Sequence, residues 1–237
     1  LEEKTNIEDG ANPDVIVVAP KTEEKAKKKR KKDISIEQVK EAIKSVGYYP
    51  YKAKYKVLII DSLSDDNTVE ICNKYNCQIN IIDRSEFNHG VTREYARKLT
   101  NIDIVVFLTQ DAIPANIESI DKLISPLIDG KASVSYGKQI SKNSTNIFES
   151  FPREYNYGDE FQIRSIRDVD KYGIFTFFCS NSCAAWSNKA LVSIGGFKPT
   201  LTNEDYFACA ELLMNGYKVA YVPEAVVTHS HDYTLKQ

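Results

Sequence analysis

The run Ile104-Val105-Val106-Phe107-Leu108-Thr109-Gln110-Asp111-Ala112 decides how this chain folds. Its first five residues are all apolar, and a polar turn that contains one carboxylate, Asp111, follows them directly. A strand that is apolar at every position is typical of a central strand with both faces covered by helices. Asp111 is then expected at the carboxyl end of the strand, where open α/β sheets bind their ligands.

Similar strands alternate with helices along the first half of the chain. The predicted strands lie at 15–19, 57–60 and 79–82, and the predicted helices at 35–47, 69–75, 92–99 and 117–128. Pro20 ends the first of these strands, because proline cannot continue a ladder of hydrogen bonds. This order predicts a single α/β domain with a Rossmann-like, mostly parallel central sheet that helices flank on both faces.

The pattern loosens beyond Gly137. Residues 143–172 are rich in polar side chains without a clean period, and we predict a long excursion of the kind that often carries function. Regularity returns in a last set of elements: an apolar stretch at 175–178, helices at 189–194 and 204–215, and strands at 218–222 and 226–229.

Composition excludes several classes of protein. The 237 residues carry 31 Lys+Arg against 33 Asp+Glu, which argues against a dedicated nucleic-acid binder. No apolar run approaches the roughly 20 residues of a membrane-spanning helix, and the polar N-terminus does not resemble a signal peptide. Five cysteines, without the spacing of a zinc site, favour reduced thiols in a cytoplasmic protein.

One segment departs from this balance. Residues 21–32 carry eight basic and two acidic side chains. A solvated loop or helix face is the ordinary interpretation, and contact with phosphates or with a membrane surface is the functional alternative.

Familiar phosphate-binding and hydrolase motifs are missing from the sequence. It contains no Gly-rich loop followed by Lys-Ser/Thr, no Gly-x-Gly-x-x-Gly after the first strand and no Gly-x-Ser-x-Gly. A P-loop enzyme, a dinucleotide dehydrogenase and a hydrolase with a nucleophile elbow are therefore disfavoured.

Polar side chains instead follow the second, third and fourth strands. Asp61, Asp65, His89, Arg93 and Asp111 are expected to converge on one edge of the sheet, although a helix cap or a turn is the alternative for each. A carboxylate beside a phosphate ligand suits Mg²⁺ or Mn²⁺.

Two further groups lie near the C-terminus. His229 and His231 fall on the same side of an extended segment and would add an imidazole ligand, unless they are structural or surface histidines. Glu204 and Asp205 open the last long helix, where acids favour the helix dipole. Alternatively, one of them is the general base for an acceptor hydroxyl.

Taken in order, these motifs resemble the family 2 glycosyltransferases of the GT-A fold, and most of all the bacterial rhamnosyltransferases of O-antigen and capsule assembly. The motifs are Asp61-Ser-x-Ser-x-Asp66, His89-Gly90-x-Thr92-Arg93, Thr109-Gln110-Asp111-Ala112, Gly195-Gly196-Phe197, Glu204-Asp205 and His229-Ser230-His231. Each motif is weak alone, whereas the ordered set, which covers about residues 14–235, is specific.

The resemblance implies an activity. It is the inverting transfer of a sugar, with rhamnose as the first candidate, to a glycan or lipid-linked acceptor. The donor would be TDP-rhamnose or a UDP-sugar, and the cofactor Mn²⁺ or Mg²⁺. It also implies a flexible segment at 1–13 and a GT-A domain at 14–237, in which 14–140 bind the nucleotide-sugar and 141–237 the acceptor. The protein would be cytoplasmic, with peripheral contact of 21–32 at the inner face of the membrane.

The resemblance also assigns roles to single residues. Asp61 and one of Asp65 and Asp66 would hold the base and ribose, and Arg93 would lie near the diphosphate. Asp111 would bind the metal, which His229 or His231 would complete, and Asp205 would be the general base, with Glu204 second. Pro20, His89, Gly90 and Gln110 complete the nucleotide-sugar set. Trp186 and Tyr206 would stack on the sugar or the acceptor, with core packing as an equal alternative.

Two departures from the family pattern keep other functions open. Gln110 stands where many relatives have a second acid. The loop after Pro20 also differs from the loop that contacts the nucleotide base in those relatives. An inactive module that binds nucleotide-sugars is therefore one alternative. A sugar nucleotidyltransferase is another alternative, although it would require a glycine-rich loop after the first strand, and the segment there contains no glycine.

Overall fold

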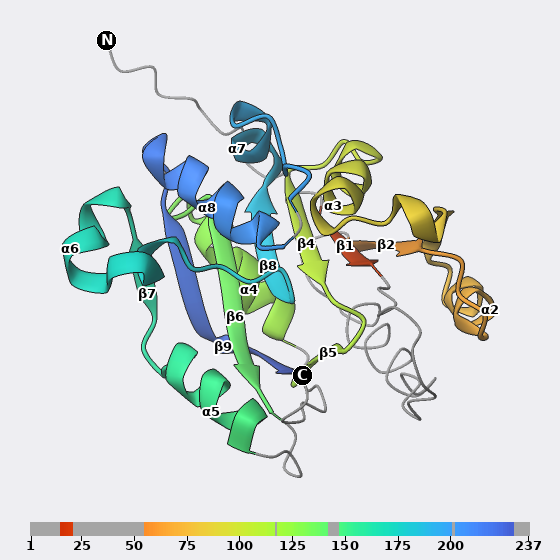
Figure 1. Cartoon of the computed structure of the whole chain (residues 1–237), viewed down its shortest axis with the longest axis horizontal. Coiled ribbons are helices and arrows are strands. Elements are labelled where there is room, and N and C mark those ends of the chain that lie inside the picture. Colours follow the sequence, from red (N-terminus) through yellow and green to blue (C-terminus); the bar gives the residue numbers. More distant parts are fainter. Residues whose placement is uncertain (1–14, 21–54, 117, 142–146, 201, 230–237) are drawn as a thin grey trace.

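The computed structural model describes residues 15–20, 55–116, 118–141, 147–200 and 202–229. Within them, nine strands form one sheet in the order β3-β2-β1-β4-β8-β6-β9-β5, and β7 pairs with β9 (Figure 1). The strands are β1 Val15–Pro20, β2 Tyr55–Asp61, β3 Gln78–Ile81, β4 Ile104–Leu108, β5 Ala112–Pro114, β6 Val134–Ile140, β7 Gln162–Arg164, β8 Cys183–Ser187 and β9 Val219–His229.

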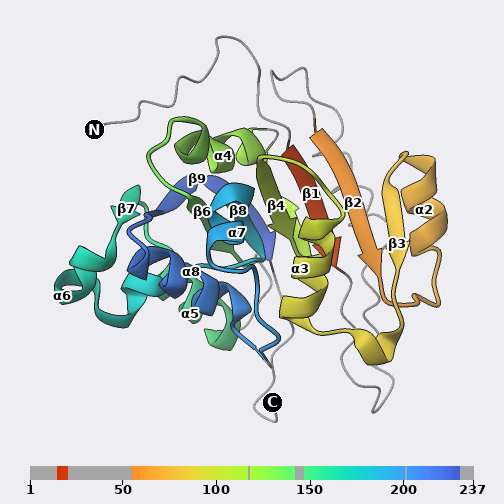
Figure 2. The same ribbon diagram turned by 90° about the horizontal axis from the view of Figure 1, so that it is seen from above.

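Helices cover both faces of this sheet. The α-helices are α2 Thr68–Lys74, α3 His89–Lys98, α4 Ser119–Ile128, α5 Ile147–Asn156, α6 Val169–Tyr172, α7 Asn188–Ser193 and α8 Glu204–Met214, and the 3₁₀ turns are η1 Arg84–Glu86, η2 Ile166–Asp168 and η3 Gly173–Phe177. Figure 2 shows α4 on one side of the sheet and α3, α7 and α8 on the other.

The apolar run of β4 separates the two halves of the core. Val105 and Phe107 pack into the cluster that includes side chains of α3, α7 and α8. Ile104, Val106 and Leu108 pack into the cluster that includes α4. All five side chains are at most 5% exposed, as expected for a strand covered on both faces.

The predicted α/β fold, a central sheet flanked by helices, is confirmed. Strands β3, β2, β1 and β4 are parallel, as the alternation of strands and helices predicted. Beyond β4 the sheet is mixed, because β8 runs antiparallel to both β4 and β6. Strand β6 runs parallel to β4, so both strands end at the same edge of the sheet. The segment that joins β6 to β8 leaves the sheet at this edge and returns to it there. Strand β8 therefore starts at that edge and runs the opposite way.

The stretch predicted as an irregular excursion contains α5, β7 and α6. Helix α5 exposes its apolar residues, with Ile147 at 69%, Phe151 at 60% and Tyr155 at 68%. Its sequence does carry an apolar stripe at helical spacing, but this stripe is exposed and is not packed into the core. The apolar stretch at 175–178 forms the end of η3, and the two C-terminal strands are one strand, β9, with an irregular register between Val222 and Val226.

Several predictions fall outside the described residues. They concern the segment 1–13, the lysine-rich segment 21–32, the helix at 35–47 and His231, and they stay predictions. In the described part of the chain, no helix combines the length and the apolar character needed to cross a bilayer.

Candidate functional site

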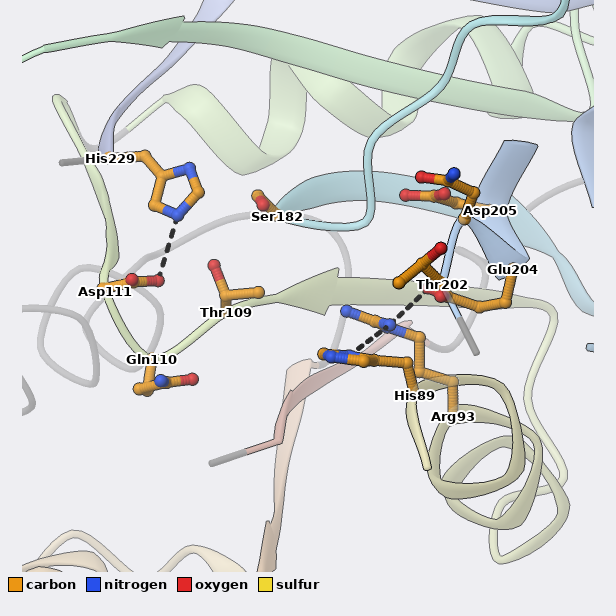
Figure 3. A pocket seen from close by; sticks show the side chains of 11 residues that line it. His89, Arg93, Thr109, Gln110, Asp111, Ser182, Thr202, Glu204, Asp205 and His229 are labelled. Carbon is orange, nitrogen blue, oxygen red and sulfur yellow. Dashed lines mark hydrogen bonds and ion pairs between the residues drawn. The ribbon is translucent and has the colours of Figure 1, made fainter. Parts of the chain in front are cut away.

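A pocket of about 270 Å³ opens at the edge of the sheet where β4 and β9 end (Figure 3). It is lined by His89 and Arg93 of α3, Thr109, Gln110 and Asp111 after β4, Ser182 before β8, Thr202, Asn203, Glu204 and Asp205 around the start of α8, and His229 at the end of β9. The structure thus brings together seven of the residues that the sequence singled out: His89, Arg93, Gln110, Asp111, Glu204, Asp205 and His229.

Asp111 and His229 face each other at one end of the pocket. The short strand β5 pairs Ala112 with His229, which places the carboxylate beside the imidazole. Their Oδ1 and Nε2 atoms are 3.2 Å apart (Figure 3). Among the described residues, no group of three or more His, Cys, Asp or Glu side chains is placed so that it could hold a metal ion by itself. Oxygen and imidazole ligands suit a divalent cation that takes its remaining ligands from substrate and water.

Arg93 and Glu204 form a buried ion pair between α3 and α8. Their side chains are 4% and 5% exposed, and Asn181 donates its side-chain N–H to the same Glu204 oxygen at 3.2 Å. His89 lies one helical turn before Arg93, with 3.3 Å between Nδ1 and the guanidinium. Burial and this guanidinium lower the pKa of His89, which favours its neutral form. The ion pair ties Glu204 to α3 and makes it a poorer general base than its neighbour.

Asp205 is held in place by two backbone donors at the start of α8. Asn181 donates its backbone N–H to Oδ2 at 2.9 Å, and Tyr206 donates its own to Oδ1 at 2.8 Å. Burial, and then the negative charge of Glu204, raise the pKa of Asp205 despite these hydrogen bonds. A carboxylate fixed in a pocket with a raised pKa has the properties of a general base.

Trp186 lies in the core, which is the alternative that the sequence left open beside stacking on the sugar or the acceptor. Its side chain is 0% exposed and packs edge-on against Phe197, with 5.1 Å between ring centroids. The indole N–H donates to Asn181 Oδ1 at 2.7 Å. Trp186 therefore belongs to the core and acts on the site only by holding Asn181, which contacts both Glu204 and Asp205.

Tyr206 follows Asp205 on α8 but does not line the pocket. Its hydroxyl donates to the backbone oxygen of Ile174, and its ring lies 6.4 Å from that of Phe177. Its role toward sugar or acceptor stays a prediction.

The acidic residues after β2 lie at the same edge of the sheet but outside this pocket. Asp61 is 1% exposed and accepts hydrogen bonds from the backbone and the hydroxyl of Ser64. Asp66 accepts the backbone N–H of Thr68, the first residue of α2, at 3.0 Å in an Asx turn, whereas the N-cap position itself is held by Asn67. Asp65 is exposed, 4.0 Å from Arg84.

Gly90 has a packing role in the structure. A Cβ atom at this position would lie 1.9 Å from the backbone oxygen of Lys198 and 3.3 Å from the Cβ atom of Glu204. Glycine therefore lets α3 approach the backbone that leads into α8, which brings Arg93 within reach of Glu204. The residue does not line the pocket, so its predicted contact with a nucleotide-sugar has no support here.

We expect Gly90→Ala to destabilise the protein by about 2 kcal/mol, because the added methyl group meets backbone that cannot move aside alone. For a domain of this size, that corresponds to a fall in Tm of roughly 4–8 °C in calorimetry. Gly158→Ala is the matched control, since a Cβ atom there has no neighbour within 4 Å. Equal Tm changes in both variants would contradict the packing role.

Sequence reasoning missed Asn181 and Gln139. Gln139 Oε1 lies 2.8 Å from Nδ1 of His229. Asn181 stands in a run of polar residues just before the apolar strand β8, a signal that could have found it. Gln139 lies within a strand and carries no comparable signal in the sequence.

Comparisons with known proteins define the class to which this fold and site belong. The family model "Glycosyltransferase like family 2" matches residues 13–237. The chain therefore belongs to the glycosyltransferase-like family 2, which confirms the resemblance seen in the sequence.

Two curated relatives and one solved structure are similar to the chain. The O-antigen chain rhamnosyltransferase WbaN of Salmonella anatum is 41% identical over 184 residues, which are 77% of this chain and 58% of the relative. The O-antigen chain rhamnosyltransferase RfbN of Salmonella typhimurium is 39% identical over 202 residues, 84% of this chain and 63% of the relative. This chain thus spans about three fifths of the length of these relatives.

The mannosyltransferase PcManGT from Pyrobaculum calidifontis, solved with GDP-Man and Mn²⁺, superposes with a TM-score of 0.62 at 16% identity. The superposition covers 92% of this chain and 56% of that one. At this identity the likeness shows a shared fold.

Proposed function

We propose that this chain transfers a sugar, rhamnose in the first place, from a nucleotide-diphosphate sugar to a glycan or lipid-linked acceptor in bacterial surface polysaccharide synthesis. The transfer inverts the anomeric carbon and depends on Mn²⁺ or Mg²⁺. The observation that supports this proposal most directly is a single pocket lined by the Asp111–His229 pair and by the fixed carboxylate of Asp205. The names of the two relatives support rhamnose as the sugar and a growing O-antigen as the acceptor.

The donor set at Asp111 and His229 fits a divalent cation. A carboxylate oxygen and an imidazole nitrogen face each other at 3.2 Å, and the pocket beside them has room for phosphate oxygens. PcManGT, which shares the fold, was solved with Mn²⁺ and GDP-Man. In this chain Asp111 and His229 would hold the ion, and His231 is a further candidate. When bound, the cation would offset the negative charge of the leaving diphosphate.

Arg93 supplies a second positive group to the same pocket. Its Nη1 atom contacts Glu204, whereas its buried Nε–H has no hydrogen-bond partner among the described residues. A buried donor without a partner is costly unless a ligand or water satisfies it. This favours the proposed contact of Arg93 with the donor's diphosphate. The roles of Pro20, Asp61, Asp65, Asp66, His89 and Gln110 toward the nucleotide-sugar stay proposals from the family resemblance.

Asp205 provides the base. Its carboxylate takes the proton of the acceptor hydroxyl while that oxygen attacks the anomeric carbon and the bond to the diphosphate breaks. The proton ends on Asp205, and the electron pair of the broken bond leaves with the diphosphate. A single displacement of this kind inverts the anomeric carbon and needs no enzyme nucleophile.

A donor screen tests the proposal. Calorimetric titrations with TDP-rhamnose, a UDP-sugar and GDP-mannose, each with Mn²⁺ and with a chelator, are expected to show binding of TDP-rhamnose that needs the metal. No binding of any nucleotide-sugar under either condition would refute the transferase. Because Gln110 replaces an acid, an inactive binding module remains the rival; release of TDP in the presence of an acceptor glycan would exclude it.

A further inference from the structure

A chain of buried and partly buried hydrogen bonds leads to the Asp111–His229 pair. His229 Nδ1 lies 2.8 Å from Gln139 Oε1, and Gln139 Nε2 donates to Ser180 Oγ at 2.9 Å. Ser180 in turn shares a side-chain hydrogen bond with Tyr157. Gln139 and His229 are 6% and 7% exposed, and they lie on the neighbouring parallel strands β6 and β9.

In the structure, the nitrogen of the Gln139 amide faces Ser180 and its oxygen faces His229. A glutamine amide donates through nitrogen and accepts through oxygen. With this orientation the amide oxygen faces the imidazole, and a neutral imidazole donates to it through Nδ1–H. The other nitrogen, Nε2, then carries a lone pair and points at Asp111 Oδ1, 3.2 Å away.

This arrangement is the one that a cation requires. A metal-binding histidine uses the lone pair of one ring nitrogen and donates the other N–H to an oxygen acceptor, which fixes both the tautomer and the ring orientation. In the metal-free chain, the hydrogen bond between Nδ1–H and Gln139 competes with the other tautomer, in which Nε2–H would donate to Asp111.

We propose that Gln139 is a positioning residue that holds His229 in the Nδ1–H tautomer and so presents Nε2 as a ligand beside Asp111. The metal-binding part of this inference rests on the proposed function. The tautomer itself is a property of the metal-free protein and is measured independently of any activity.

The first test is nuclear magnetic resonance of the ¹⁵N-labelled, metal-free chain at about pH 8, where an ordinary histidine is neutral. Long-range ¹H–¹⁵N spectra distinguish the two neutral tautomers. The chain has three histidines, and the spectrum of His229→Gln identifies the signals of His229. We expect Nδ1–H in the wild type. An Nε2–H tautomer there would overturn the proposal, whatever the outcome of the donor screen.

Two variants separate positioning from packing. Gln139→Met keeps a similar volume but removes the acceptor, so His229 is expected to change to Nε2–H and to donate to Asp111. Gln139→Glu keeps an acceptor oxygen and is expected to retain Nδ1–H. The signals of His89 serve as an internal reference in each variant. An unchanged tautomer in folded Gln139→Met would overturn the proposal.

The second readout is the affinity for Mn²⁺ in the presence of TDP, measured by electron paramagnetic resonance of the free ion. Loss of a hydrogen-bond partner behind a metal ligand typically weakens metal binding by about 10- to 100-fold. We expect a loss in this range for Gln139→Met and a smaller loss for Gln139→Glu. A changed tautomer with unchanged Mn²⁺ affinity would overturn the role of Gln139 toward the metal and leave its effect on His229 intact.

Discussion

Replacing Asp205 by asparagine is expected to lower the rate of sugar transfer by about 10²- to 10⁴-fold, the usual contribution of a positioned general base. An amide of the same shape cannot accept the acceptor's proton at neutral pH. Affinity for the donor should change little, because the metal pair at Asp111 and His229 is untouched. Transfer kinetics and donor titrations on the same preparation separate the two effects.

Asp170→Asn is the matched control, since Asp170 is an exposed aspartate on α6 outside the pocket. It should leave transfer unchanged. Transfer at the wild-type rate in folded Asp205→Asn would remove Asp205 as the base.

The pH dependence of transfer tests the same assignment. The base works as a carboxylate, and burial together with Glu204 raises the pKa of Asp205. The rate should therefore fall as the pH drops through the pKa of Asp205, which is higher than that of an ordinary aspartate, and this acid limb should vanish from the residual activity of Asp205→Asn. The raised pKa of Asp205 also determines how the stability of the fold depends on pH. Folding favours the protonated form of Asp205, so its contribution to stability is largest at low pH and is lost as the pH rises through the folded-state pKa.

Replacing Asp111 by asparagine is expected to weaken metal-dependent donor binding by about 10²-fold or more, because the carboxylate is the charged ligand of the proposed cation site. The amide keeps the shape of the turn after β4 but loses the negative charge. Calorimetric titration of TDP-rhamnose with Mn²⁺ measures the effect, which should disappear when a chelator replaces the metal.

Asp103→Asn is the matched control for this variant, because Asp103 is an exposed aspartate just before the other end of β4. It should bind the donor as the wild type does. If Asp111→Asn retained full Mn²⁺-dependent binding, the cation site would lie elsewhere.

The first half of the fold follows directly from sequence patterns. Strand β4 has the predicted bounds because its apolar residues pack against helices on both faces, and β1, β2 and β3 join it in parallel. Beyond β6 the pattern was less informative. Helix α5 turns its apolar residues outward, and the direction of β8 depends on where the chain returns to the sheet.

The sequence predicted those residues of the candidate site whose chemistry can be recognised from a single side chain and its place in the chain. Asp111 lies in the turn after β4, and Asp205 lies in the first turn of α8, where polar side chains stand out from the apolar strands. The partnership of Arg93 with Glu204 spans 111 positions and depends on the close approach of helices that Gly90 permits. No local pattern encodes it. Trp186 was ambiguous because an aromatic side chain in an apolar strand fits both a core and a stacking platform.

The position of a bound cation tests the central claim most directly. Crystals of the chain grown with Mn²⁺ and TDP, and measured near the manganese absorption edge, locate the ion by its anomalous scattering. The account predicts a peak at coordination distance, roughly 2.0–2.4 Å, from a carboxylate oxygen of Asp111 and from Nε2 of His229, with a phosphate oxygen of TDP as a further ligand. A peak away from this pair, or TDP bound in the pocket without any ion, would contradict it.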